Sequence, residues 1–208
     1  MKRKAVWVAP LAMLAMVAAA NAQTWAEVGD AGELPTTFQD PTGSGPLTAI
    51  TGTAGGQDVD LYNIRIVNPA GFSATTVGGA TWDTQLWLFH KPPRTPNGVT
   101  FNDDSQGTLQ STLTGQFVPA PGDYLLGISA YDRDAADPAG LEIWADVPFG
   151  VERPPDGPGA PGPLAGWVGT GFGSGTYTIA LTGVVFKPEP ATLAMLALGG
   201  LAMLRRRR

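Results

Sequence analysis

"PAPGDYLLGISAYD", residues 119–132, decides the fold class of this chain. Apolar side chains occupy every second position of its central part, at Tyr124, Leu126, Ile128 and Ala130. A period of two places these side chains on one face of a half-buried β-strand. The Pro-Ala-Pro-Gly cluster at the start of the stretch is typical of a turn, so the stretch indicates a turn followed by a strand.

Three further stretches carry strand patterns. Residues 62–66 and 176–182 alternate between apolar and polar side chains, whereas residues 84–89, "TQLWLF", are apolar on both faces, as in a central strand. Clusters of Pro, Gly, Asn and Asp separate these runs, and no segment from residue 23 to residue 187 has the pattern of a capped helix. We therefore predict an all-β fold, a single β-sandwich of the jelly-roll type.

The expected domain covers residues 57–187 and follows a lead-in segment, residues 23–56. One part of the domain differs in composition: residues 148–171, "PFGVERPPDGPGAPGPLAGWVGTG", are too rich in Pro and Gly for a strand or a helix. We predict that this part is a long loop packed around Trp167.

The order of the pieces carries a resemblance. "DVDLYNIRI", "DTQLWLF", "NDDS", "PAPGDYLLGISAYD" and "SGTYTIALTG" follow one another between residues 57 and 183. This succession resembles the bacterial pre-peptidase C-terminal domain, a small β-sandwich appended to secreted peptidases and other surface proteins. The chain has His90 where that family usually has Asp or Asn, and it contains no peptidase domain. The resemblance therefore implies the fold and not a role beside a peptidase.

The N-terminal 22 residues have the layout of a secretory signal peptide. Lys2, Arg3 and Lys4 form a basic start, an apolar stretch extends to about residue 19, and Ala20-Asn21-Ala22 is a small-residue cleavage site. We expect a signal helix that directs export and is removed by signal peptidase.

The C-terminal 21 residues have three parts in order. These are Pro188-Glu189-Pro190, an uncharged stretch over residues 191–204, and the cluster Arg205, Arg206, Arg207 and Arg208. The uncharged stretch is shorter than the roughly 20 residues of an ordinary membrane span, but the arginines would hold its end on the cytoplasmic side. We therefore expect a short transmembrane helix there.

The three parts together resemble the PEP-CTERM sorting signal. That resemblance implies processing by an exosortase, a membrane transpeptidase-like enzyme of Gram-negative bacteria, with Glu189 as a recognition residue. It also implies an intermediate anchored in the inner membrane, followed by delivery to the cell surface or extracellular matrix.

The charge of the exported part limits its partners. Residues 23–187 carry six basic and 17 acidic side chains, a formal net charge of −11. Such a surface repels nucleic acid, anionic lipid and acidic polysaccharide unless cations bridge them. Because the chain has no cysteine, the domain holds together without disulfides.

No catalytic constellation is evident in the sequence. His90 is the sole histidine, there is no G-x-S-x-G motif, and the chain lacks the Cys and His ligands of a zinc site. We name no catalytic residue and expect a protein that is not an enzyme. A hydrolase with a carboxylate pair stays an alternative because many Asp are present.

Clustered carboxylates suggest calcium instead. Asp58 and Asp60 lie two residues apart at a strand start, and Asp103 and Asp104 follow Asn102. A third cluster contains Asp132, Asp134 and Asp137. Ca²⁺ takes oxygen ligands from such loops, and we predict a site from Asp58, Asp60, Asp103 and Asp104. The alternative is that these Asp only favour turns.

Tryptophan offers a second binding chemistry. Trp144 and Trp167 bracket the Pro/Gly-rich loop, where they would contact a sugar if they were exposed or belong to the core if they were not. The leading hypothesis is a non-enzymatic structural or adhesive protein of the cell surface, with extracellular polysaccharide as a partner. A carbohydrate-binding module is the first alternative and a secreted hydrolase the second.

Overall fold

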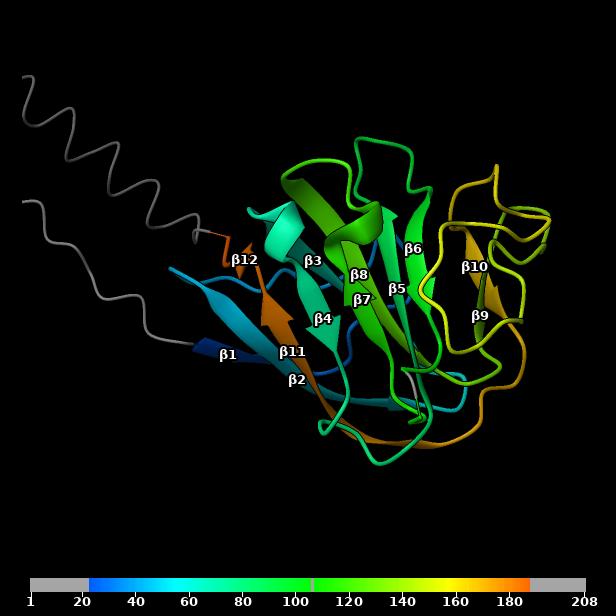
Figure 1. The fold of residues 1–208 in the computed structure, drawn as a ribbon, viewed down its shortest axis with the longest axis horizontal. Helices are drawn as coiled ribbons and strands as arrows, with labels where there is room; N and C mark the ends of the chain where they lie inside the picture. Colours follow the sequence, from blue (N-terminus) through cyan, green and yellow to red (C-terminus); the bar gives the residue numbers. More distant parts are fainter. Residues whose placement is uncertain (1–22, 106, 188–208) are drawn as a thin grey trace, which may run out of the picture.

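The computed structural model describes residues 23–105 and 107–187, which form two five-stranded β-sheets packed face to face (Figure 1). The first sheet has the strand order β1 (Gln23–Ala26), β2 (Leu47–Gly55), β11 (Ser174–Thr182), β4 (Ser73–Thr75) and β7 (Thr112–Thr114). The second sheet has the strand order β12 (Val184–Val185), β3 (Asp60–Ile66), β8 (Gly122–Ala130), β5 (Thr84–His90) and β6 (Gly98–Asn102). The all-β prediction is confirmed.

The remaining elements are short. Strands β9 (Asp134–Ala136) and β10 (Gly166–Val168) form a two-stranded antiparallel ribbon at one end of the molecule (Figure 1). Two 3₁₀ turns, η1 (Pro69–Gly71) and η2 (Gly115–Phe117), are the helical elements of the described residues. Neither of them approaches the length and apolar character that a membrane span requires.

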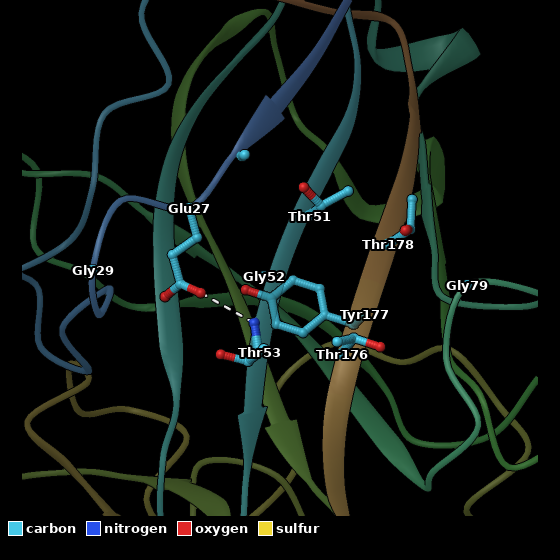
Figure 2. A pocket seen from close by; sticks show the side chains of 10 residues that line it. Glu27, Gly29, Thr51, Gly52, Thr53, Gly79, Thr176, Tyr177 and Thr178 are labelled. Carbon is cyan, nitrogen blue, oxygen red and sulfur yellow. Dashed lines mark hydrogen bonds between the residues drawn. The ribbon is translucent and has the colours of Figure 1, made fainter.

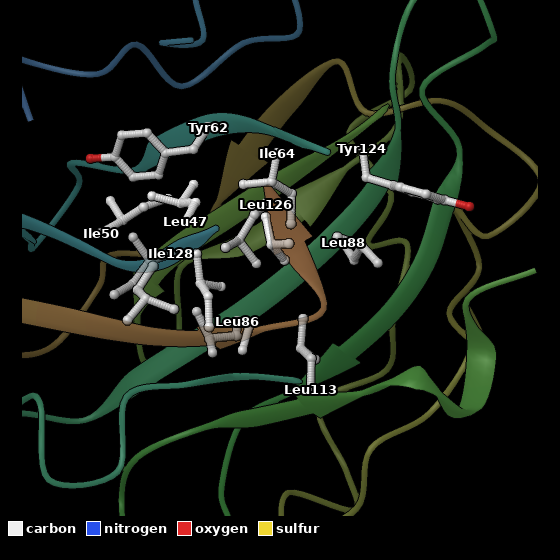
Figure 3. Packing of buried hydrophobic residues seen from close by; sticks show 14 of the residues in the cluster. Leu47, Ile50, Tyr62, Ile64, Leu86, Leu88, Leu113, Tyr124, Leu126 and Ile128 are labelled. Carbon is white, nitrogen blue, oxygen red and sulfur yellow. The ribbon is translucent and has the colours of Figure 1, made fainter. Parts of the chain in front are cut away.

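The core between the sheets is built from the alternating side chains. Figure 3 shows Ile64, Leu86, Leu126 and Ile128 of the second sheet facing Leu47, Ile50 and Leu113 of the first. Each of these side chains is almost completely buried. At about 25 cal/mol per Å² of apolar surface, this layer is the main source of stability for a chain without disulfides.

Strand β8 differs from its prediction on one point. It is the centre of the second sheet and pairs antiparallel with both β3 and β5. The sequence predicts one buried face, but every residue from Tyr124 to Ala130 is buried. The outer face of this sheet is covered by residues 137–165, the covering segment, which lies between β9 and β10.

A second apolar cluster lies beneath the covering segment. Trp87 of β5 stacks on Phe101, with ring centroids 4.0 Å apart, and meets Trp144 and Trp167 edge-on at 5.4 and 5.6 Å. The Trp87 indole N–H donates to Ser129 Oγ at 2.8 Å. The Pro/Gly-rich region contains the buried Trp167 and is not all loop, since β10 falls within residues 148–171.

Arg153 fixes the covering segment to β6. Its backbone N–H and C=O exchange hydrogen bonds with Phe101 at 3.0 and 3.1 Å. Its buried guanidinium donates to the carbonyl oxygens of Val147, at 2.6 Å, and Ala145, and pairs with Asp156 at 3.1 Å. The arginine therefore satisfies carbonyls that a Pro-rich segment cannot pair with its own N–H groups.

The sheets also begin earlier than expected. Strands β1 and β2 lie within residues 23–56, so this segment belongs to the sandwich and is not a lead-in. Strand β1 runs parallel to β2 and forms the edge of the first sheet. The expected signal peptide, residues 1–22, and the expected C-terminal transmembrane helix within residues 188–208 lie outside the described residues.

Candidate functional site

Acidic side chains gather at one end of the second sheet. Asp83 precedes β5, and Asp103 and Asp104 follow β6, so the antiparallel pairing of the two strands places all three together. One carboxylate oxygen from each lies within 4.8 Å of the others. Asp134, Glu142 and Asp146 form a second such group. We call the whole arrangement the acidic end.

A small pocket is enclosed by the acidic end. It has a volume of about 120 Å³ and is lined by Gln85, Asp103, Tyr131, Asp132, Asp134, Asp146, Val147 and Phe149. A chain of hydrogen bonds leads into it: Ser129 Oγ donates to Gln85 Oε1 at 3.1 Å, and Gln85 Nε2 donates to Asp134 Oδ1 at 3.1 Å. The Asp134 carboxylate is therefore held in place by Gln85, which is itself held by Ser129.

Three carboxyl groups of the acidic end, those of Asp83, Asp103 and Asp134, have raised pKa values. Burial, followed by the charges of Asp104, Asp83 and Asp134, raises the pKa of Asp103 to about 8. Burial, together with Asp104, raises the pKa of Asp83 to about 6. Burial also raises the pKa of Asp134 to about 6, against the effect of its hydrogen bond from Gln85. These side chains repel one another when all are ionised.

Asp60 belongs to a different group. It is fully buried between the sheets, accepts a hydrogen bond from the Tyr177 hydroxyl at 2.5 Å, and lies near Glu27 and Asp30. Asp58, one residue before the buried Val59, is exposed. The four residues predicted to share one calcium site therefore do not form one group: Asp103 and Asp104 are together, and Asp60 is elsewhere.

The buried carboxyl of Asp60 predicts a pH dependence. Burial is the main cause that raises its pKa from 3.8 to about 8, with Glu27 and Asp58 adding repulsion and the Tyr177 hydrogen bond opposing them. Between these two values the folded state binds more protons than the unfolded state, so this group's stabilising contribution is lost as the pH rises from about 4 to 8.

We expect the free energy of unfolding, measured by denaturant titration in EDTA, to fall from pH 5 to pH 9. The Asp60→Asn variant should show a shallower fall. Asp30→Asn is the matched control, because it removes the same charge from an exposed side chain. Equal slopes for Asp60→Asn and the wild-type protein would contradict this assignment.

The outward-facing strand positions of the first sheet carry no charged side chain. Its inward positions, such as Ile50, Ile179 and Leu113, are in the core, so the alternate positions face outward. Those positions carry only Thr, Ser, Ala or Gly: Thr24, Ala26, Ala49, Thr51, Thr53, Gly55, Ser73, Thr75, Thr112, Thr114, Ser174, Thr176, Thr178, Ala180 and Thr182. We call this surface the hydroxyl face.

A groove of about 470 Å³ crosses the hydroxyl face. Figure 2 shows Thr51 and Thr53 of β2 beside Thr176 and Thr178 of β11, with Glu27 on one side and Gly79 on the other. Glu27 is held in place by backbone N–H groups, from Thr53 at 3.1 Å and from Ala31 at 2.8 Å. The groove therefore offers hydroxyl groups and one fixed carboxylate.

Neither tryptophan proposed for sugar binding is exposed. Trp144 is 2% exposed and Trp167 is 9% exposed. Both indole N–H groups donate to backbone carbonyls, of Arg153 at 3.2 Å and Glu33 at 2.7 Å. The two side chains belong to the second apolar cluster and form no flat platform, because the covering segment needs them as its own core.

His90 has the surroundings of a structural residue. Its ring lies near that of Tyr124, with centroids 5.7 Å apart. Burial, together with the charge of Arg94, lowers its pKa. A catalytic base would need a carboxylate to orient it, and no hydrogen bond to one is present among the described residues.

The comparisons with known proteins concern the C-terminus. The family model for the PEP-CTERM protein-sorting motif matches residues 188–208. This chain ends in a PEP-CTERM motif. No curated protein and no solved structure matches the chain. The resemblance of the sandwich to the pre-peptidase C-terminal domain stays a prediction.

The PEP-CTERM motif marks the chain as an exported protein that an exosortase sorts. The match covers the predicted sorting motif, Pro188, Glu189 and Pro190, as well as the terminal arginines. The motif also indicates the order of events, a membrane-anchored form first and the exported form afterwards.

Proposed function

We propose that this protein is a non-enzymatic structural or adhesive component of the surface or extracellular matrix of a Gram-negative bacterium. The PEP-CTERM motif is the observation that carries the proposal, because it commits the chain to export and sorting. The proposed partner is extracellular polysaccharide.

The hydroxyl face supports an adhesive role. The exported part has a formal net charge of −11, but the outward positions of the first sheet bear no charge. The strands of this face therefore add no charge of their own, and threonine hydroxyl groups both donate and accept hydrogen bonds, as sugar hydroxyls do. A neutral polysaccharide chain fits the groove better than an acidic one, because Glu27 lies at its edge.

A carbohydrate-binding module is the first alternative, and the same groove favours it. The groove, about 470 Å³, lies in the range of about 300–1,000 Å³ typical of ligand sites. The buried tryptophans argue against sugar stacking, so binding would rely on hydrogen bonds and methyl contacts. A hydrolase is the second alternative, but the acidic pocket, about 120 Å³, is small for a substrate.

The hydroxyl face can be tested by placing a charge on it. The Thr178→Glu variant should bind polysaccharide from the producing strain about tenfold more weakly in co-sedimentation, because a carboxylate covered by the bound chain must lose water without a partner. Thr95→Glu is the matched control, since it adds the same charge to an exposed loop away from the groove.

Melting curves of both variants should resemble that of the wild-type protein. Equal loss of binding in both variants would indicate a general charge effect and contradict the assignment to the hydroxyl face. Unchanged binding in Thr178→Glu would also contradict it.

A further inference from the structure

Asp103 is a buried carboxylate without a hydrogen-bond partner. The residue is 2% exposed, and no described residue bonds its Oδ1 atom. Its neighbour Asp83 also has a buried Oδ1 atom without a partner. Leaving buried carboxylate oxygens unpaired is costly, so two of them side by side indicate a ligand with positive charge.

No side chain among residues 23–105 and 107–187 fills this role. Within these residues, Arg153 is the base whose charge lowers the pKa of Asp103. Its guanidinium bonds instead to the carbonyls of Val147 and Ala145 and to the Asp156 carboxylate. Each of these partners belongs to the covering segment, so the arginine is committed to holding that segment.

We propose that the acidic end binds a divalent cation, with calcium preferred, through the carboxylates of Asp83, Asp103 and Asp104. Their oxygens lie within 4.8 Å of one another, close enough for a single ion to contact all three. Ca²⁺ takes six to eight oxygen ligands in a flexible arrangement, and Mg²⁺ requires a stricter octahedron with several waters. Three carboxylates give three to six oxygens, and water in the adjoining pocket completes the shell.

The ion would connect three parts of the fold. Asp83 and the pair Asp103 and Asp104 flank strands β5 and β6, and the Asp104 N–H donates to the Phe149 carbonyl at 3.3 Å. Val147 and Phe149 of the covering segment line the pocket next to the site. A bound cation would therefore also stabilise the layer that buries Trp87 and Trp144.

The test compares melting temperatures of the full-length chain in mild detergent, with EDTA and with CaCl₂. At about 100 times Kd, calcium should raise the melting temperature by roughly 5–10 °C. The Asp103→Asn variant should lose this rise. In EDTA it should melt no lower than the wild-type protein, because the Asn amide is uncharged and keeps the shape of the side chain. A purely structural Asp103 would give a lower melting temperature in EDTA.

Two further variants keep the outcome clear. Asp104→Asn alters a half-buried ligand at the edge of the site, so it should fold and bind calcium more weakly even if Asp103→Asn fails to fold. Asp60→Asn is the control for the separate group with Glu27 and Asp30. The bound-calcium stoichiometry should fall by one ion in Asp103→Asn. A calcium effect that is unchanged in Asp103→Asn and Asp104→Asn, or that is lost in Asp60→Asn alone, would overturn the proposal.

Discussion

Replacing Glu189 by alanine is expected to stop sorting and leave the protein as the membrane-anchored form. Glu189 lies between two prolines, which have no backbone N–H and restrict their own torsion angles, so its carboxylate is the charged group of the Pro-Glu-Pro part of the motif. Cell fractionation and intact mass measure the result: the variant should stay in the inner-membrane fraction and retain the mass of residues 188–208.

Lys187→Ala is the matched control for this experiment. Lys187 immediately precedes the PEP-CTERM motif, and its ammonium group pairs with Asp40 at 2.8 Å on the surface. Loss of such an exposed pair costs about 0–1 kcal/mol, so sorting should proceed normally. Normal release of the Glu189→Ala variant would contradict recognition by an exosortase.

The Trp87→Ala variant should be the most destabilised single substitution in the described domain. Trp87 contacts Phe101, Trp144 and Trp167, so its removal leaves a cavity beneath the covering segment. It also removes the hydrogen bond to Ser129. We expect a loss of about 3–5 kcal/mol in the free energy of unfolding, measured by denaturant titration.

Val151→Ala is the control for this second prediction. Val151 lies in the covering segment but is exposed, so its replacement should change stability by less than about 0.5 kcal/mol. The Trp87→Ala variant should also be cleaved by protease within residues 137–165 before the sandwich is lost. A loss below about 1 kcal/mol would show that the second apolar cluster contributes little.

The strands were predictable because their patterns are local. The alternation in residues 176–182 predicts both the core side chains of β11 and the outward threonines of the hydroxyl face. The second buried face of β8 was not predictable from its own residues. It depends on the covering segment, which has no hydrophobic period and packs through Trp144 and the buried Arg153, and on Trp167 of β10.

The acidic end was only partly predictable. The neighbours Asp103 and Asp104 stand out in the sequence, but Asp83 joins them only because β5 and β6 are antiparallel partners. A strand predicted at residues 98–102 and paired antiparallel with residues 84–89 would have placed Asp83 beside Asp103 and Asp104. Asp58 and Asp60 appear equivalent in the sequence, yet Asp60 points between the sheets and Asp58 lies outside them.

The two ends of the described chain lie at the same end of the sandwich (Figure 1). Gln23 begins β1 directly after the expected signal-peptide cleavage site, and Lys187 ends the domain directly before the PEP-CTERM motif. Both lie at the end of the sandwich opposite β9 and β10 (Figure 1). A molecule tethered through its C-terminal residues would therefore be held at the end that carries β1 and β12, and β9, β10 and the covering segment would lie at the end far from the tether.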